Sequence, residues 1–297
     1  MVLFLEVLIS GLLAGVMYGL VALGFVLIYK ASGVFNFSQG AMVFFGALTV
    51  TGLHQLGLSL WLAIPATAAV IVVVAFLTER LVLNPLLAQP PISLFMATLG
   101  LTFVIEGVAQ AVWGSNARAL DLGIPDMPLE GLLDATGIGV STFDLVASLI
   151  AIVLIVSLTL FFSYTKTGRA LRAVADDTKA ALSIGIPLRQ VWVIVWSTAG
   201  FVALVAGLLW GSRNGVQFSL TFVALKAFPV LIIGGFSSVP GAFVGGLIVG
   251  ASEKLADVYI GPHVGGGIDG WLPYVLALGF LLIRPEGIFG DRIIRRV

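Results

Sequence analysis

The sequence predicts an all-α membrane protein, a polytopic transmembrane helix bundle of about eight to nine spans with some interrupted helices. Two observations carry this prediction. The 297 residues are 59% hydrophobic and only 10% charged, with a mean hydropathy of +1.13, whereas soluble domains are about 45–50% apolar and about 25% charged. The apolar residues also form runs long enough to cross a bilayer core, which takes roughly 20 helical residues. We expect one transmembrane domain over residues 1–297.

Nine apolar segments follow one another along the chain, a count that we hold to within one. They lie near residues 3–29, 33–52, 59–78, 92–113, 143–164, 191–212, 220–236, 240–260 and 270–285. The first is too long for a cleaved signal peptide and has no basic residues before it, so we expect it to remain as a helix. The seventh, with Pro229 inside it, and the last are short for a span, so they need a thinned or protein-shielded part of the bilayer.

Lysine and arginine are distributed unevenly between the loops, and this predicts the orientation. One side holds most of them: Lys30, Arg80, the basic residues of the segment 165–190, and those from Arg284 to the C-terminus. Loops on the other side contain only Arg118 and Arg213. We therefore expect the segment 165–190 and the C-terminus in the cytoplasm and, with an odd number of spans, the N-terminus outside.

A long acidic loop, residues 114–142, is then extracytoplasmic. It packs over the outer mouth of the protein, meets a soluble partner, or is a plain surface loop. The segment 165–190 is the most polar stretch of the chain and must lie in water, where it suits a docking element; the alternative is a basic loop that only fixes topology. Its charged residues are Lys166, Arg169, Arg172, Asp176, Asp177, Lys179 and Arg189.

Two breaks in the apolar pattern are alike. Residues 33–43 and 235–244 each form a short polar, glycine-containing break that is followed by Gly-Ala, then Met or Phe, then Val. A parallel internal repeat would explain the similarity, because transporter folds often place interrupted helices at corresponding positions along the substrate path. Chance similarity between glycine-rich turns explains it as well.

The first break contains Asn36, Ser38 and Gln39, uncharged polar residues at the start of an apolar helix. Such groups need internal partners or water in a membrane. They line a polar pathway or its cytoplasmic gate, together with Phe37, or they cap the helix that starts near Gly40. The aromatic rings around them fit a small, partly apolar solute, and core packing explains them equally well.

Ionisable residues inside spans are costly, so they usually face protein or water. Here they are Glu106, Lys226, Glu253 and Lys254. We expect Lys226 to pair with, or lie near, Glu106 or Glu253, for charge neutralisation more than for chemistry.

Glycines recur at helical spacing, and small residues at this spacing let membrane helices approach closely. They are Gly11, Gly15 and Gly19, and then Gly241, Gly245 or Gly246, and Gly250. We expect these faces to serve helix packing.

Several kinds of chemistry are not supported. Cysteine is absent, and His54 and His263 lie far apart in the sequence, so we expect no metal site. No phosphate-binding loop of the form GxxxxGK[ST] occurs, so the chain cannot hydrolyse ATP by that route. No span holds a cluster of His, Cys or paired carboxylates, which argues against a membrane-embedded enzyme.

Seven motifs, taken in their order and spacing, resemble the LivH-type permeases of branched-chain amino acid ABC importers. They are Gly15 to Gly24, Asn36-Phe37, Ser163 to Ala175, Ala181 to Ile186, Lys226-Ala227-Phe228, Ser237 to Gly246 and Arg284-Pro285-Glu286-Gly287. The resemblance implies a permease subunit, not an enzyme, of an ATP-driven importer in the inner (cytoplasmic) membrane, carrying branched-chain or other small neutral amino acids or related amides or carboxylates.

The resemblance also implies partners: a second, LivM-like permease subunit, two cytoplasmic ATPase subunits and an extracytoplasmic substrate-binding protein, with no nucleic acid. This chain would bind no cofactor, since ATP and Mg would be held by the ATPases. Within the segment 165–190, the positions that match the family's ATPase-docking helix are Ala173, Asp176, Ala180, Ala181, Gly185 and Ile186. Arg169, Arg172 and Lys179 would bind acidic groups of the ATPase.

One departure leaves the solute open. LivH-type chains often have Asn-Phe-Ala-His-Gly where this chain has Asn36-Phe37-Ser38-Gln39-Gly40, so an amide replaces a ring nitrogen. A second hypothesis is a stand-alone secondary transporter or channel for a small polar solute, with Glu106 and Lys226 as coupling charges.

Overall fold

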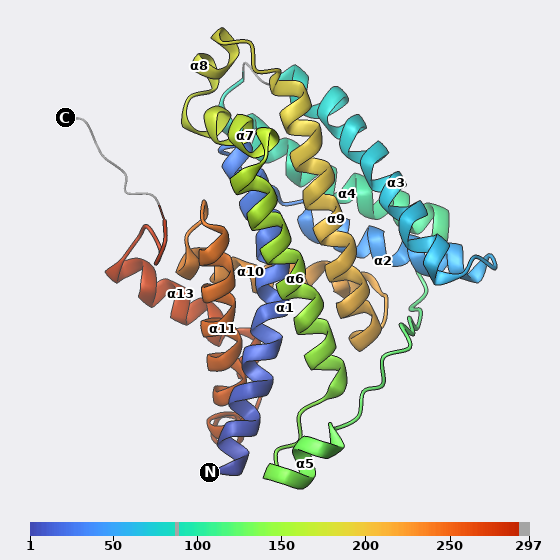
Figure 1. Ribbon diagram of the computed structural model, residues 1–297, viewed down its shortest axis with the longest axis vertical. Helices are drawn as coiled ribbons and strands as arrows, with labels where there is room; N and C mark the ends of the chain where they lie inside the picture. Colours follow the sequence, from blue (N-terminus) through green and yellow to red (C-terminus); the bar gives the residue numbers. More distant parts are fainter. Residues whose placement is uncertain (87–88, 291–297) are drawn as a thin grey trace. The chain divides into compact units, whose positions relative to one another are not determined.

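The computed structural model describes residues 1–86 and 89–290, apart from the side chains of Pro91, Thr178 and Lys179 (Figure 1). The last three arginines of the basic tail, Arg292, Arg295 and Arg296, lie outside the described residues. Throughout the described ranges every regular element is a helix, so the all-α fold class is confirmed. The elements are α1 Val2–Ser32, α2 Gln39–Gln55, α3 Leu60–Thr78, η1 Glu79–Leu83, η2 Asn84–Leu86, α4 Pro91–Trp113, α5 Glu130–Thr136, α6 Thr142–Tyr164, α7 Lys166–Asp176, α8 Thr178–Ser183, α9 Leu188–Asn214, η3 Phe218–Phe222, α10 Val223–Gly234, α11 Val239–Tyr259, α12 Gly261–Val264, η4 Ile268–Gly270 and α13 Leu272–Ile283.

Each of the nine expected apolar segments contains a helix. Five helices within the described residues are long and apolar enough to cross a membrane by themselves: α1, Leu60–Leu86, Ile92–Trp113, α6 and α9. A sixth span is possible if Phe218–Gly234 and Val239–Tyr259 count as one, although they are bent by 112° at the turn between them. The other expected spans are shorter helices, namely α2 with 17 residues and α13 with 12.

The chain divides into two compact units. One comprises residues 1–23, 123–155 and those from 225 onward, and the other comprises residues 24–122 and 156–224. Because α1 and α6 each contribute to both units, the units are not successive pieces of sequence.

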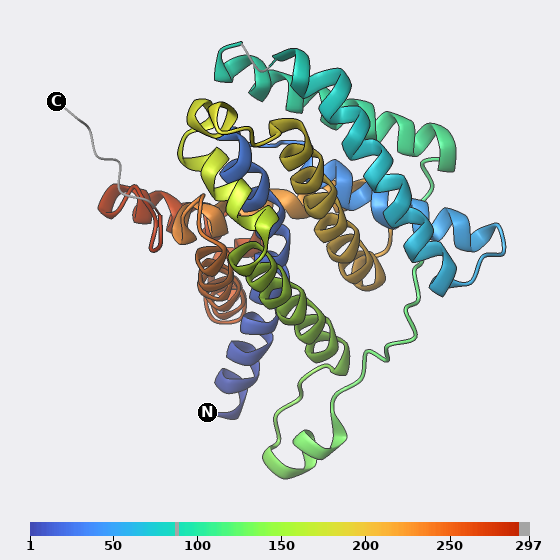
Figure 2. The same cartoon turned by 45° about the horizontal axis from the view of Figure 1, so that its top comes forward.

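In the unit formed by residues 24–122 and 156–224, α2 is the central helix. Its residues from Gln39 to Gly52 are all buried, and it packs against α3, α4 and α9 (Figures 1 and 2). Glycines permit this packing. A Cβ on Gly207 of α9 would lie 2.3 Å from the carbonyl oxygen of Val43, and a Cβ on Gly52 would lie 2.1 Å from a ring carbon of Trp113.

In the other unit, α11 packs against the first part of α1 through the glycines that the sequence singled out. A Cβ on Gly250 would lie 2.3 Å from the carbonyl oxygen of Gly11, and a Cβ on Gly246 would lie 2.4 Å from that of Gly15. The predicted role of these glycines in helix packing is confirmed. On the neighbouring α6, the Ser148 hydroxyl donates to the carbonyl oxygen of Leu13, 3.0 Å away.

Residues 284–290, which we call the C-terminal strap, return from α13 to the turn between α10 and α11. The amide of Ile288 donates to the carbonyl oxygen of Ile233 over 2.8 Å, and that of Phe289 donates to Gly234 over 3.0 Å. Ile233 and Gly234 are the last residues of α10, and the last carbonyl groups of a helix have no amide donor within that helix. Gly235 follows with φ +104°, a conformation that favours glycine.

Candidate transport and coupling sites

The first polar break is a buried turn. Asn36, Ser38 and Gln39 are each 0% exposed. The Asn36 Oδ1 accepts hydrogen bonds from the backbone amide and the hydroxyl of Ser38, at 3.1 and 2.7 Å. Ser38 occupies the N-cap position of α2, yet its side chain makes no capping hydrogen bond. The capping interpretation is therefore wrong, because Asn36 stabilises the turn before the helix instead of satisfying the first amides of α2.

Gln39 fills a gap between three helices. Its Nε2 donates to the carbonyl oxygen of Ala199 on α9 over 3.2 Å. The same amide lies against α1, where a Cβ on Gly24 would come within 1.9 Å of the Nε2 atom. Gly24 is thus required by a close approach, and Gln39 joins α1, α2 and α9 through one polar group.

Phe37 belongs to a row of packed aromatic rings. Its ring packs edge-on against Phe35 and Phe95, with 4.9 Å between centroids in both pairs, and Phe35 stacks on Phe25 at 4.7 Å. The Thr98 hydroxyl of α4 fixes the backbone of this turn: it accepts from the Phe37 amide over 3.3 Å and donates to the Phe35 carbonyl over 3.2 Å. In the described conformation, core packing accounts for these rings.

Two polar atoms of this turn are buried without a partner. Across residues 1–86 and 89–290, neither Asn36 Nδ2 nor Gln39 Oε1 has a hydrogen-bond partner. Leaving such a group unpaired costs about 1–3 kcal/mol, which is unusual in a native core. Asn36 Nδ2 therefore has unused donor capacity and Gln39 Oε1 has unused acceptor capacity.

The expected intramembrane ion pair exists in the unit that contains α11. Lys226 Nζ lies 2.8 Å from Glu253 Oε1, and the pairing predicted from the sequence is confirmed. Two members of this cluster were missed. Asp269 Oδ2 lies 3.2 Å from Lys226 Nζ, and the Tyr18 hydroxyl donates to Glu253 Oε1 over 3.1 Å. Asp269 escaped notice because it lies beyond a glycine-rich turn, and Tyr18 because it is uncharged.

Glu106 belongs to the other unit, on α4, and is 7% exposed. A second buried carboxylate there was not singled out from the sequence. Glu79 is 1% exposed, and its Oε2 lies 3.2 Å from Arg189 Nε. Arg189 also sits over the ring of Phe76, with its Cζ 5.5 Å from the centroid. This ion pair ties the end of α3 to the start of α9.

The polar segment 165–190 forms two short helices, α7 and α8, that lead into α9. α7 folds tightly against the end of α6: a Cβ on Gly168 would lie 1.8 Å from the carbonyl oxygen of Phe162. The Thr165 hydroxyl caps α7 by accepting from the Gly168 amide over 3.1 Å. Leu171 and Val174 are buried on one face of α7, so α7 is an amphipathic helix that packs through this face.

Most of the expected docking positions on α7, on α8 and in the turn after α8 are exposed. Arg169, Arg172, Asp176, Ala180 and Gly185 are exposed, and Ala173 and Ile186 are half-buried. Ala181 is only 2% exposed, so it packs inside and does not belong to this surface in the described conformation. Arg172 also donates to the Ser163 carbonyl over 3.1 Å.

Two apolar side chains, missed from the sequence, stand out on this polar segment. Leu182 is 51% exposed and Ile184 is 74% exposed. We call these two residues, together with the exposed or half-buried Arg169, Arg172, Ala173, Asp176, Ala180, Gly185 and Ile186, the docking surface.

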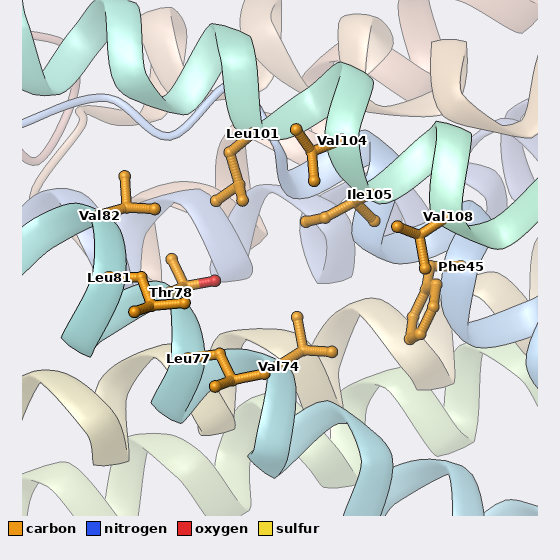
Figure 3. Close-up of a pocket in the computed structure, with 10 residues that line it drawn as sticks. All are labelled: Phe45, Val74, Leu77, Thr78, Leu81, Val82, Leu101, Val104, Ile105 and Val108. Carbon is orange, nitrogen blue, oxygen red and sulfur yellow. The ribbon is translucent and has the colours of Figure 1, made fainter.

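An apolar groove of about 290 Å³ lies between α2, α3 and α4 (Figure 3). Its lining residues are Phe45, Val74, Leu77, Thr78, Leu81, Val82, Leu101, Val104, Ile105 and Val108. Leu81 is 67% exposed and Val104 is 60% exposed. A groove with this lining cannot replace the water around a polar solute, so it is not a conduit for one.

Among the described residues, no group of three or more His, Cys, Asp or Glu side chains could hold a metal ion. The molecule instead combines long apolar helices, a bent helix pair, buried polar turns and a water-exposed amphipathic segment. These features define a multi-pass helical membrane protein.

Sequence comparison identifies the family. Residues 7–283 match the model of the branched-chain amino acid transport system permease components, and the chain belongs to this family. It is a permease component of an ABC transport system and not an enzyme. Such a component works with ATPase and substrate-binding components.

Known members are similar over almost the whole chain. The high-affinity branched-chain amino acid transport system permease protein LivH of Salmonella typhimurium is 28% identical, covering 99% of this chain and 98% of that protein. BraD of Pseudomonas aeruginosa, which has the same description, is 28% identical with the same coverage. The probable branched-chain amino acid transport permease protein LivH of Methanocaldococcus jannaschii is 29% identical, covering 91% and 88%.

Proposed function

We propose that this chain carries branched-chain or other small neutral amino acids, or related amides or carboxylates, into the cell as one half of a permease pair. The second half would be a LivM-like subunit, and two ATPases would bind on the cytoplasmic side. Family membership favours this function over a stand-alone secondary transporter, and the docking surface is the single observation that carries the coupling step.

The docking surface supports ATPase binding for two physical reasons. An exposed apolar pair in water, Leu182 and Ile184, gains free energy when a partner covers it. The exposed guanidinium groups of Arg169 and Arg172 would bind acidic groups of the ATPase through charge-assisted hydrogen bonds. This assignment puts the segment 165–190 and the C-terminus in the cytoplasm and the loop 114–142, with the N-terminus, outside.

Force would pass from the docking surface into the membrane helices through short connections. α7 is held to the end of α6 by the Gly168 contact, and the segment ends where α9 is tied to α3 by the Arg189–Glu79 pair. A rigid-body movement of the docked helices would thus move α6, α9 and α3 together. Alternating access then requires that ATP-bound and ATP-free partners favour different arrangements.

The test is a charge reversal on the docking surface. R169E/R172E should weaken copurification of the ATPases and lower ATP-dependent uptake by about tenfold or more, since attraction to acidic groups becomes repulsion. The matched control is R213E. α9 has 27 residues, about 40 Å at 1.5 Å per residue, so the exposed Arg213 lies near the opposite membrane face. Equal ATPase binding by R169E/R172E and R213E would refute the docking assignment.

A further inference from the structure

The start of α2 brings together hydrogen-bonding groups that the fold does not use. α2 has 17 residues and no side-chain cap at its N-terminus. The first amides of a helix have no acceptor within it, and the helix dipole makes this end favourable for negative charge. An uncapped helix start by itself is only a tendency, but here a second feature is added.

That feature is the Asn36 side chain. It is 0% exposed, and its Oδ1 accepts from the amide of Ser38, the N-cap residue of α2, so the carboxamide lies at the N-terminal end of this helix. Among the described residues its Nδ2 has no partner. A buried, unpartnered amide donor therefore lies at the start of α2, the end of a helix whose first backbone amides have no acceptor within the helix.

One acceptor completes the set. The Gln39 Nε2 is held by Ala199, which fixes the orientation of the carboxamide, and within the described residues the Gln39 Oε1 has no partner. Several donors at a helix start and one nearby acceptor match a carboxylate that carries an ammonium group on the adjacent carbon.

The site is closed in the described conformation by η3. A Cβ on Gly40 would lie 2.4 Å from the carbonyl oxygen of Thr221 and 2.9 Å from the Cβ of Ala224. Gly40 thus lets η3 lie directly on the first turn of α2. Movement of η3 would uncover the helix start, whereas the described packing excludes a solute from it.

We propose that the uncapped start of α2, with Asn36 Nδ2, is a binding site for the carboxylate group of an α-amino acid, that Gln39 Oε1 accepts from its ammonium group, and that η3 covers the site. This inference rests on the proposed function, since it assigns a resting point to the carried solute. The site recognises the groups common to all α-amino acids and leaves the side chain to other parts of the importer.

Two probes test the site on the full chain in detergent. L-Leucine carries both groups, and L-leucinamide lacks only the carboxylate. L-Leucine at increasing concentration should raise the temperature of unfolding, because a ligand that binds the folded chain stabilises it, and L-leucinamide should not. Equal stabilisation by both probes would overturn the proposal. Acetate, which is a carboxylate without the ammonium group, serves as a third probe. The proposal would also be overturned if neither L-leucine nor acetate raised the temperature of unfolding.

The variant N36D tests the donor. It keeps the oxygen that accepts from Ser38 but replaces the Nδ2 donor with a second carboxylate oxygen, so L-leucine should bind about tenfold more weakly or worse. N214D is the matched control, because it makes the same change at the exposed end of α9. Undiminished binding by N36D would overturn the proposal, and if N36D fails to fold, the comparison of the two probes on the unchanged chain still decides it.

Failure of the site and failure of the proposed function give different results. A chain that binds L-leucine through Asn36 but copurifies with no ATPase keeps the site and loses the coupling function. A chain that binds ATPases through Arg169 and Arg172 but distinguishes neither probe keeps the function and loses the site.

Discussion

Removing the Lys226 ammonium group should cost more stability than removing any other member of its cluster. In K226M, Glu253 would remain as a carboxylate that is 3% exposed, with the Tyr18 hydroxyl as its remaining partner. Breaking a buried ion pair from one side costs about 3–5 kcal/mol. Because the Lys226 side chain is 29% exposed, we expect a loss of about 3 kcal/mol, near the lower limit.

The other changes have smaller expected effects, for reasons that the structure supplies. Y18F removes one neutral donor and should cost about 1 kcal/mol. D269N should cost less than about 1 kcal/mol, because the Asp269 side chain is 46% exposed and its pairing is screened by water. The double variant K226M/E253Q removes both buried charges and should regain most of the loss in K226M.

Unfolding in mixed micelles with increasing dodecyl sulfate measures these differences, with the fluorescence of the six tryptophans as the signal. The order of loss should be K226M, then Y18F, then D269N, with K226M/E253Q close to the unchanged protein. If K226M/E253Q is less stable than K226M, then neutralising Glu253 brings no relief. In that case the loss in K226M does not come from an unpaired buried carboxylate, and the reasoning is refuted. A D269N loss as large as that of K226M would also refute it.

Two further predictions concern helix contacts. R189A should be less stable than E79Q/R189A, since only the single variant leaves Glu79 charged and buried; the same unfolding experiment decides this, and equal stabilities would contradict it. G246V should fold poorly or lose about 1–3 kcal/mol by overpacking, because a Cβ there meets the Gly15 carbonyl oxygen at 2.4 Å. G279V is its control, as nothing lies within 4 Å of a Cβ on Gly279; equal yields of folded G246V and G279V would contradict the prediction.

Composition and apolar run length were sufficient to predict the fold class. Backbone polar groups inside a bilayer must be hydrogen-bonded within the protein, and for long apolar runs the helix is the structure that achieves this. The cost of buried charge also predicted that Lys226 pairs with Glu106 or Glu253, and close packing in lipid predicted a packing role for the glycines. The sequence did not choose between the two carboxylates or say that the glycines of α1 meet those of α11. The angle of the bend between α10 and α11 was not predictable, because a hydropathy pattern shows where a helix is interrupted but not the direction in which the next helix runs.

The site residues were harder to assign from sequence. Asn36 and Gln39 were noticed as polar residues, but only the coordinates distinguish a capping side chain from a buried amide with an unused hydrogen-bonding atom. Glu79 was missed because it lies at the end of an apolar run, where a charge is expected in any loop. Leu182 and Ile184 were not predicted as surface residues, because the sequence of an apolar chain does not distinguish an exposed apolar side chain from a buried one.

The C-terminal strap has a consequence for biosynthesis. The amides that complete the end of α10 belong to Ile288 and Phe289, which lie 55 residues further along the chain than the carbonyls of Ile233 and Gly234 that they bind. During synthesis, the end of α10 therefore has two carbonyls without these donors until α11, α13 and the C-terminal strap have all been made. A nascent chain stalled before Arg284 would lack the strap, and the end of α10 would lack both of these hydrogen bonds.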